Sequence, residues 1–329
     1  MAFANANISD ILATTIQSRT RKVADNVTKN NALLMRLSQR GNIKPFSGGS
    51  SILQELSFAE NTNAGWYSGY DILPVGVSDV ISAAEYPICQ AAVPVVISGL
   101  EMLQNSGKER MIDLMDARLT VAENTMKNLI SVGLYSDGTG AGGKQIDGLG
   151  AAIVAAAGNT ATYGGITRAA SGITAFWYNQ IQDTGTTITA TTIQTQFNTL
   201  WAKCSRGNDV PDLIMCDNIT WGLYMASLQA VQRFASPEVG DLGFASLKFI
   251  NADVVLDGGI GGASFVPSAS AYFLNTDYLF FRPHAQRNMV PLAPNKRYAT
   301  NQDAEVQILG WAGNLTASSL QLQGYYNGT

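Results

Sequence analysis

The longest amphipathic pattern in the chain runs from Ser106 to Asp137. Ser106 and Glu109 form a capping-box signature at its start, and Asp137-Gly138 ends it. At about 1.5 Å per residue this helix is on the order of 40 Å long. The segment predicts a structural spine, and an ordinary core helix is the alternative. Apolar residues recur at steps of three, four or seven on one face: Met111, Leu114, Met115, Ala122, Met126, Leu129 and Gly133.

Two runs with strand-like alternation flank a loop rich in aromatic residues. The runs cover Ser51 to Phe58 and about Ile81 to Ser98, and prolines within and beside them exclude them from the middle of a sheet. Between them lie Trp66, Tyr67 and Tyr70, alternating with glycines. Because large aromatic side chains are not left uncovered on a free loop, this loop predicts a contact with a partner.

The remainder of the chain alternates helical and strand-like patterns, which indicates a compact α/β or α+β unit. Near the amino terminus, Asn7 or Ser9 can cap an amphipathic helix, and a second helical piece runs from Val27 to Gly41. Residues 151–190 are rich in Ala, Gly and Thr, and the pattern places no element there. The later elements predicted are a helix at Thr192–Arg206, a strand at Pro211–Cys216, a helix capped by Asp217, strands at Val254–Leu256, Tyr272–Leu274 and Tyr278–Phe281, and two antiparallel strands between Asp303 and Gly324 that close back on the spine.

The composition indicates self-association. The chain has 329 residues, of which 46% are apolar and only 14% are charged, and its net charge is −4. A free monomer normally carries more surface charge, so we expect much of the uncharged surface to face other copies of the chain. The net negative charge argues against a protein whose main role is to bind nucleic acid.

The charge is unevenly distributed along the chain. Residues 1–50 carry seven basic side chains against two acidic ones, whereas the other 279 residues carry 14 basic and 23 acidic ones. We interpret the basic arm as a solvated helix face. The alternative is an arm pressed on an acidic partner subunit or near a packaged polyanion.

Two segments carry opposite charge without any of the other sign. Between Pro45 and Gly107 there are six carboxylates and no Lys or Arg, whereas the run from Arg282 to Arg297 holds four basic residues and no acid. We predict an acidic, aromatic-tipped hairpin whose Asp71 and Glu85 lie over that basic run of an adjacent subunit. The predicted subunit-interface residues are Trp66, Tyr67, Tyr70, Asp71, Glu85, Arg282, Arg287, Lys296 and Arg297.

Few residues could carry chemistry. Gly138 to Lys144 matches the G-x-x-x-x-G-K part of a phosphate-binding loop, but Gln145 replaces the Ser or Thr that holds magnesium, and the segment follows a helix instead of a strand. We interpret it as a glycine linker. His284 is the only histidine, and no Ser or Cys has the context of a nucleophile. We predict no catalytic, cofactor-binding or metal-binding residue.

The chain has no feature of a secreted or membrane-spanning protein. Its start lacks the basic and apolar regions of a secretion signal, and no apolar run reaches the roughly 20 residues that span a bilayer. Cys89, Cys204 and Cys216 lack metal-like spacing, which predicts reduced, packed thiols. We therefore expect a soluble, intracellular product.

A series of short motifs between residues 50 and 325 resembles the major capsid proteins of tailed bacteriophages. The resemblance implies an α+β capsid fold that is also found in encapsulins and in the floor of herpesvirus shells. The motifs are Trp66-Tyr67-Ser-Gly-Tyr70, Ala84-Glu-Tyr86, Gln90-Ala-Ala92, Ser98-Gly-Leu-Glu101, Asn275-Thr-Asp-Tyr278, Arg282-Pro-His284, Arg287-Asn, Asn301-Gln-Asp-Ala-Glu305 and Trp311-Ala-Gly-Asn-Leu315.

The resemblance also implies how the chain divides. The parts would be an N-terminal arm at 1–49, an extended β-hairpin loop at 50–98, a peripheral domain with the spine helix at 99–150 and 296–329, and an axial domain at 151–295. Some members of the family crosslink their shells through a lysine of the extended loop, but this loop has none. No long segment precedes the arm, so a separate or a cleaved scaffolding protein is expected.

The implied function is structural. Hexamers and pentamers of one chain would form an icosahedral shell around double-stranded DNA, with a portal partner, non-specific DNA contacts, no cofactor and no membrane. The protein would assemble in the host cytoplasm and reside in the virion. The alternatives are an encapsulin-like compartment, a tubular virion protein, and a nucleotide-binding enzyme built on Gly138 to Lys144.

Overall fold

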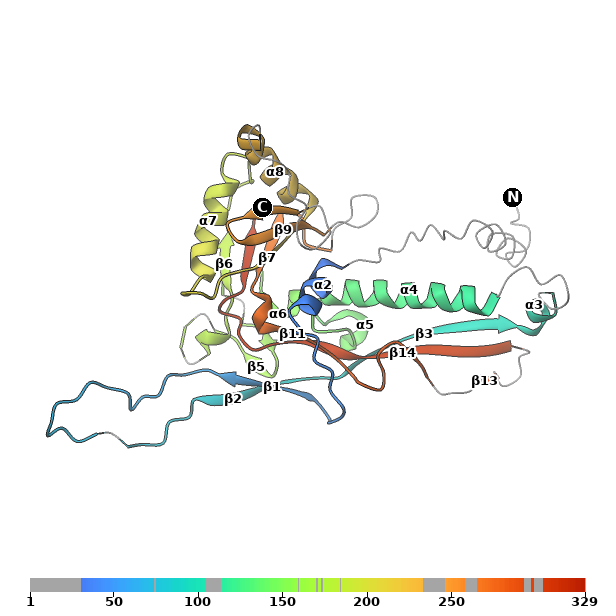
Figure 1. Cartoon of the computed structure of the whole chain (residues 1–329), viewed down its shortest axis with the longest axis horizontal. Helices are drawn as coiled ribbons and strands as arrows, with labels where there is room; N and C mark the ends of the chain where they lie inside the picture. Colours follow the sequence, from blue (N-terminus) through green and yellow to red (C-terminus); the bar gives the residue numbers. More distant parts are fainter. Residues whose placement is uncertain are drawn as a thin grey trace.

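The computed structural model describes residues 31–73, 75–104, 114–158, 160–169, 171–172, 174–183, 185–232, 246–257, 265–292, 297–298 and 304–328. Figure 1 shows a long, flat unit, an upright unit built around a second sheet, and a hairpin that extends away from both. Helices and strands are mixed in each unit, so the α+β class is confirmed. None of the described helices is long and apolar enough to cross a membrane.

The flat unit is a sheet with one helix along it (Figure 1). Helix α4 (Leu114–Leu134) lies against strands β3 (Cys89–Ser98) and β14 (Ala304–Ala317). β3 contains Pro94 and, among the strands that the structure describes, pairs with β14 alone, so the predicted edge position is confirmed. Along its other side β14 pairs with β11 (Leu279–Pro283), β12 (Val290–Pro291) and β13 (Arg297–Tyr298).

The buried face of α4 follows a step of four residues. Ala122, Met126, Ile130 and Leu134 are buried, as the sequence pattern predicted for the first two. The prediction for Leu129 is wrong, because this residue is 47% exposed and lies beside the buried stripe of the helix. Leu129 and the buried Ile130 are adjacent in the sequence, so a helix directs them about 100° apart.

A capping box occurs at a different helix from the one expected. The predicted box at Ser106 and Glu109 lies outside the described residues. Helix α3 (Gly99–Gln104) begins with a reciprocal pair, in which the Ser98 backbone N–H donates to Glu101 Oε2 at 3.1 Å and the Glu101 N–H donates to Ser98 Oγ at 3.3 Å. Arg118 Nη2 of α4 donates to Glu101 Oε1 at 2.8 Å, which ties the two helices together.

The upright unit contains a six-stranded sheet. Its strand order is β6-β15-β10-β7-β9-β8, and the central strands β7 (Leu213–Cys216) and β10 (Ser270–Leu274) are buried at every position. Helix α7 (Ile193–Cys204) contributes Phe197 to a core of aromatic rings between helix and sheet. The other elements are β6 (Gln180–Asp183), β8 (Ser246–Phe249), β9 (Ala252–Leu256), β15 (Gly324–Asn327) and α8 (Asn218–Gln232).

Several predicted elements of this unit are confirmed. The expected helix at 192–206 is α7, and the buried strand at 211–216 is β7. Asp217 caps α8, since its Oδ1 accepts from the Thr220 backbone N–H at 2.9 Å.

The prediction for the carboxyl-terminal strands is partly wrong. A single long strand, β14, returns along the spine helix. β15 does not pair with it but lies between β10 and β6 in the other sheet, and it is parallel to β6. The alternating pattern predicted strands here, but it could not show that the chain changes sheets after Ala317.

The hairpin consists of β1 (Ile52–Ser57) and β2 (Ile81–Tyr86), which pair in antiparallel register from Ile52↔Tyr86 to Ser57↔Ile81. The single run expected from Ile81 to Ser98 is therefore two strands in different sheets. It divides at Pro87, which has no N–H to continue a ladder.

The remaining elements are short. Helix α2 (Ala32–Gln39) confirms the second helical piece of the arm, and its N-cap Asn31 accepts from the Leu34 N–H at 3.1 Å. The first predicted arm helix lies outside the described residues. The other elements are α5 (Gly140–Gly143), α6 (Leu149–Ala152), β4 (Thr162–Tyr163), β5 (Ile166–Thr167), η1 (Ala175–Trp177) and η3 (Thr276–Tyr278).

Candidate assembly surfaces

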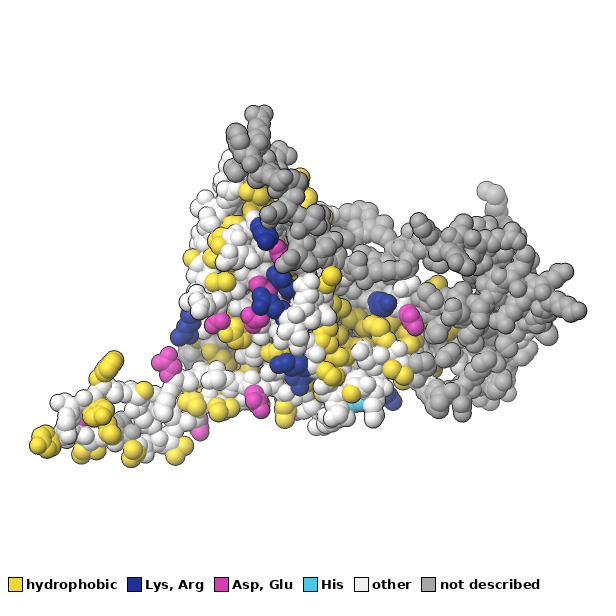
Figure 2. Space-filling view, viewed as in Figure 1, with side chains coloured by type: hydrophobic (Ala, Val, Ile, Leu, Met, Phe, Trp, Pro, Cys, Tyr) yellow, Lys and Arg dark blue, Asp and Glu magenta, His cyan; other side chains and the backbone are white. Residues whose placement is uncertain are grey.

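The loop of the hairpin exposes large apolar side chains to solvent. We call residues 61–78 the hairpin tip. Trp66 and Tyr70 are fully exposed, and Figure 2 shows apolar side chains along the whole projection. An apolar surface of this extent is typical of a protein interface. The other large apolar residues exposed in the tip are Tyr67, Ile72, Leu73, Val75 and Val77.

The only charge in the hairpin tip, Asp71, forms a local turn. The Ser68 N–H donates to Asp71 Oδ2 at 2.8 Å, and the Asp71 N–H donates to the Ser68 carbonyl at 2.8 Å. The turn keeps the carboxylate exposed and orders the chain between the two tyrosines, Tyr67 and Tyr70. This arrangement shapes the tip without covering its apolar side chains.

Within one chain, the acidic residues and the basic residues of the predicted charged contact do not meet. Asp71 and Glu85 are exposed on the hairpin, whereas Arg282 is half-buried on β11 and Arg287 is exposed in the loop after it. No ion pair joins these two acids to these two arginines. Lys296 lies outside the described residues, and Arg297 is described only as part of strand β13.

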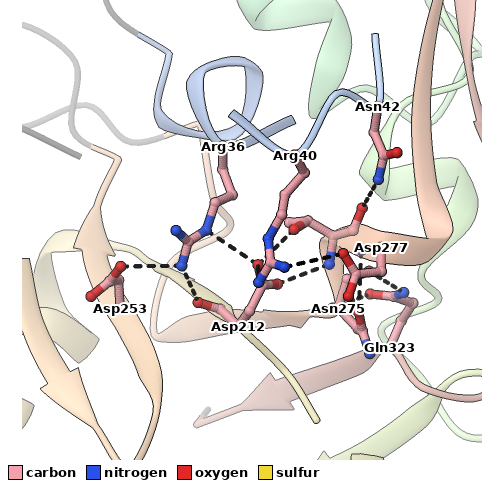
Figure 3. A network of polar contacts seen from close by, with 9 residues as sticks. Arg36, Arg40, Asn42, Asp212, Asp253, Asn275, Asp277 and Gln323 are labelled. Carbon is pink, nitrogen blue, oxygen red and sulfur yellow. Dashed lines mark hydrogen bonds and ion pairs between the residues drawn. The ribbon is translucent and has the colours of Figure 1, made fainter. Parts of the chain in front are cut away.

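A polar network fixes the root of the basic arm to the upright unit. Figure 3 shows Arg36 and Arg40 of α2 directed at Asp212, which directly precedes β7. Arg36 Nη2 donates to the Asp212 carbonyl at 3.0 Å and to Asp253 Oδ2 at 3.2 Å. Arg36 Nε lies 3.2 Å from Asp212 Oδ2, and Arg40 Nη2 lies 3.3 Å from the same oxygen. We call these residues, with Thr276, the arm-root network.

Both oxygens of the Asp212 carboxylate also accept hydrogen bonds from Thr276. The Thr276 N–H donates to Oδ1 at 2.9 Å and the Thr276 hydroxyl donates to Oδ2 at 2.6 Å. Asn42 Nδ2 donates to the Thr276 carbonyl at 2.6 Å, so the chain that follows α2 is held as well. Asp212 and Asp253 are largely buried, which makes their pairing with arginine necessary for the fold.

The network changes the interpretation of the described part of the basic arm. Arg36 and Arg40 bind aspartates of their own chain, so they do not form a purely solvated helix face. The basic residues Arg19, Arg21, Lys22 and Lys29 lie outside the described residues. The sequence could not reveal the pairing because Asp212 and Asp253 follow Arg36 and Arg40 by more than 170 positions. Charge counting by segment could not identify these partners.

The structure shows the surroundings of the two motifs that were considered for chemistry. The segment Gly138–Lys144 follows helix α4, and α5 within it is a single irregular turn in which Ala141 and Gly142 have positive φ. It therefore lacks the strand-to-helix context of a phosphate-binding loop. The His284 ring packs edge-on against Phe46 with centroids 5.0 Å apart, and its Nδ1 accepts from the Gln286 N–H.

The cysteines are unreactive packing residues. All three are buried and free of disulfides, as predicted. Burial raises the pKa of the Cys89 thiol to about 11 and that of Cys204 to about 12, so both stay protonated at neutral pH. Among the described residues, no group of three or more His, Cys, Asp or Glu side chains could hold a metal ion.

The fold can be compared with solved structures. The capsid asymmetric unit of cyanophage A-1(L) is 18% identical, with a TM-score of 0.63 over 94% of this chain and 98% of the other. The capsid of a native GTA particle is 12% identical, with a TM-score of 0.58 over 91% of each chain. The chain has the fold of phage capsid proteins. The holo-SrpI encapsulin of Synechococcus elongatus PCC 7942 shares this capsid fold at 10% identity, with a TM-score of 0.56 over 100% of this chain and 96% of the other.

Comparisons of the amino-acid sequence, unlike those of the structure, found no similar protein. No protein-family model matches the chain, and the search of curated proteins found no relative. At identities of 18% and below, the similarity to capsid structures establishes the capsid fold and not the individual contacts. The motifs that resembled capsid proteins nevertheless predicted this fold.

Proposed function

We propose that this chain is the major capsid protein of a tailed bacteriophage, which self-assembles as hexamers and pentamers into an icosahedral shell around double-stranded DNA. The capsid fold over nearly the whole chain and the uncovered apolar hairpin tip support this function. The tip is the observation that carries it, because an exposed apolar surface of this extent marks a contact with another chain. Many copies of one modest contact suffice, since closure of a shell adds them together.

The proposed parts of the subunit follow the two sheets. The division expected from the sequence is 1–49 for the arm, 50–98 for the extended loop, 99–150 and 296–329 for the peripheral domain, and 151–295 for the axial domain. We propose three changes based on strand pairing. β11 and β12 go with the peripheral domain because they pair with β14. β3 goes with the peripheral domain because it pairs with β14, and β15 goes with the axial domain because it pairs with β10.

We propose two kinds of contact between subunits. The apolar side chains of the hairpin tip, Trp66, Tyr67 and Tyr70 foremost, supply most of the buried area. Asp71 and Glu85 lie over the basic run that includes Arg282, Arg287, Lys296 and Arg297 of a neighbour and set the register of the contact.

The partners beyond the chain itself are a separate scaffolding protein, a portal protein, and DNA through non-specific contacts. We place the protein in the virion, after assembly in the host cytoplasm. The similar solved structures are structural proteins, so a non-enzymatic role is favoured, without a cofactor. An equilibrium ATP-binding assay on wild type and Lys144→Ala tests the competing nucleotide-binding function, which predicts saturable binding that the variant loses.

Negative-stain electron microscopy of the purified, concentrated protein tests the proposed function. We expect closed shells or capsomers of five or six subunits. Dispersed monomers at every concentration and salt condition tested, in the presence of a scaffolding protein as well, would contradict it. Tubes would indicate a tubular virion protein.

An encapsulin-like compartment is the second candidate, because the encapsulin structure matches the whole length of this chain. The contents of shells purified from the native source distinguish the two functions. Nuclease-protected double-stranded DNA supports the capsid. A co-purified protein cargo without DNA supports the compartment.

A further inference from the structure

Part of the segment for which the sequence predicted no element packs against the root of the hairpin. We call residues 151–178 the root-support segment and the strands β1 and β2 the hairpin root. The Glu85 N–H of β2 donates to the Gly164 carbonyl at 3.0 Å. Gly164, in the β4–β5 turn, has φ +58, and a Cβ atom added there would lie 2.9 Å from both Ala84 and the Tyr86 ring. Only glycine fits this contact without a shift of β2.

Aromatic residues extend the contact into the flat unit. The rings of Tyr86 and Tyr163 pack edge-on with centroids 5.0 Å apart. The Tyr163 hydroxyl donates to the Leu315 carbonyl of β14 at 3.2 Å, and Trp177 Nε1 donates to the Tyr163 carbonyl at 2.9 Å. Tyr86, Tyr163 and Trp177 are buried, so the end of the hairpin root next to the body packs into the core, whereas Ile81 at the far end of β2 is exposed.

Arg168 holds the root-support segment together. The side chain is only 1% exposed, and it donates to the carbonyls of Ala151, Ala152 and Ala161, with its guanidinium 5.7 Å from the centre of the Tyr163 ring. No carboxylate of the described residues forms an ion pair with it. A buried cation without an acid is costly, so the three carbonyls and the ring must stay in place around it.

Because the hairpin is long, a small rotation at its root displaces its tip by a large distance. From Tyr86 back to Tyr70 the chain spans at most about 50 Å when extended. A rotation of about 5° at the root therefore moves the tip by about 4 Å, which is the width of a side-chain contact. The position of the tip is thus sensitive to small changes in the root-support segment.

We propose that Arg168 and Gly164 are positioning residues that set the angle at which the hairpin leaves the body, and through it the curvature between neighbouring subunits. The inference has two parts, the hairpin angle and the curvature between subunits, and only the second rests on the proposed shell function. The hairpin angle is a property of the single chain. The two parts can therefore fail separately.

Distance measurements on dispersed protein test the first part. Spin labels are placed at Gly65→Cys in the hairpin tip, where the added side chain meets nothing within 4 Å, and at Asn198→Cys, which is exposed on α7. The three native cysteines are buried and stay unlabelled. We expect one main distance in the otherwise wild-type chain, and a shift or broadening of several ångströms with Arg168→Met or Gly164→Ala. The exposed Arg206→Met is the matched control and should leave the distance unchanged.

Shell diameters measured by electron microscopy test the second part. We expect wild-type and Arg206→Met protein to give one diameter, and Gly164→Ala to give mixed or altered diameters. Arg168→Lys, which keeps the charge but has fewer donors, serves as the milder variant if Arg168→Met does not fold. Unchanged distances in folded Gly164→Ala and Arg168→Lys would overturn the inference. Changed distances with unchanged diameters would overturn the link to curvature, and absence of wild-type shells would count against the proposed function alone.

Discussion

The two ends of the hairpin differ in how their apolar residues are covered. At the hairpin root, Ala84 and Tyr86 are completely buried against the chain's own body. At the hairpin tip, Trp66 and Tyr70 are completely exposed, although both ends belong to one antiparallel ribbon. These exposed aromatic side chains do not stabilise the fold of a single subunit, because they bury no apolar surface within it. The root therefore belongs to the fold of one subunit, whereas we propose that the tip belongs to a contact between subunits.

The largest effect is expected from the tip. Trp66→Ser with Tyr70→Ser removes two large aromatic anchors, and interface anchors of this kind contribute on the order of 2 kcal/mol or more each. We expect shell assembly to be lost in sedimentation and electron microscopy, while the thermal unfolding midpoint of the dispersed protein stays within about 2 °C of wild type. Ile219→Ser, which removes an exposed apolar residue on α8, is the control and should assemble.

The second-largest effect is expected when the arm-root network is broken. Like the hairpin root, this network belongs to the body of one subunit, so the change should lower the stability of the monomer. Asp212→Ala leaves Arg36 and Arg40 without their shared carboxylate and should destabilise the chain by about 3–5 kcal/mol. Chemical denaturation measures this. Asp277→Ala is the control, because the Asp277–Arg40 pair is exposed and contributes about 0–1 kcal/mol. Equal effects of the two variants would show that the network does not hold the arm.

An intermediate effect is expected from charge reversal on the hairpin. Asp71→Lys with Glu85→Lys should slow assembly at low salt, since the altered side chains then face the basic run of the neighbour. Reversal of Arg287 to Glu in the same chain should restore part of the rate, as followed by light scattering. If neither change affects assembly at any salt concentration, the proposed charged contact is wrong and the tip binds through apolar contacts alone.

The smallest effect is expected from Glu101, which stabilises the body away from the hairpin. Burial opposes its ionisation, but the Ser98 N–H and the Arg118 guanidinium outweigh burial and lower the pKa of Glu101 below its usual value. A lowered pKa contributes stability above the unfolded-state value of about 4.3, and this stability is lost as the pH falls through the folded value. Glu101→Gln should therefore cost about 1 kcal/mol at pH 7 and little below pH 3. A cost that does not change with pH would contradict this role.

The sequence predicted those parts of the fold whose signals are local. The apolar face of α7 is visible in the spacing of residues within the helix, and Asp217 caps α8 through the Thr220 N–H three residues on, so periodicity and capping rules found them. The aromatic hairpin tip was also predicted, because exposed apolar residues between glycines are visible in the sequence itself. The capsid fold followed from the same motifs.

The missed features depend on contacts between distant segments. Arg168 is an ordinary residue in a sequence rich in Ala and Gly, and its role arises from backbone carbonyls, which carry no sequence signal. Asp212 and Arg36 are far apart in the chain and meet only after folding. The Ser98–Glu101 capping box was visible as Ser-x-x-Glu, but it follows a strand directly, and a longer apolar pattern favoured Ser106 instead.

Chemical footprinting of the hairpin tip tests the central claim most directly. Hydroxyl-radical oxidation of Trp66, Tyr67 and Tyr70 is measured by mass spectrometry in dispersed subunits and in assembled shells. We expect fast oxidation in the subunits and strong protection in the shells, with half-buried Tyr178 as a reference on the body whose change sets the background. Protection already present in dispersed monomers would mean that the hairpin folds onto its own body, and equal oxidation in both states would mean that no neighbour covers it; either result would contradict the account.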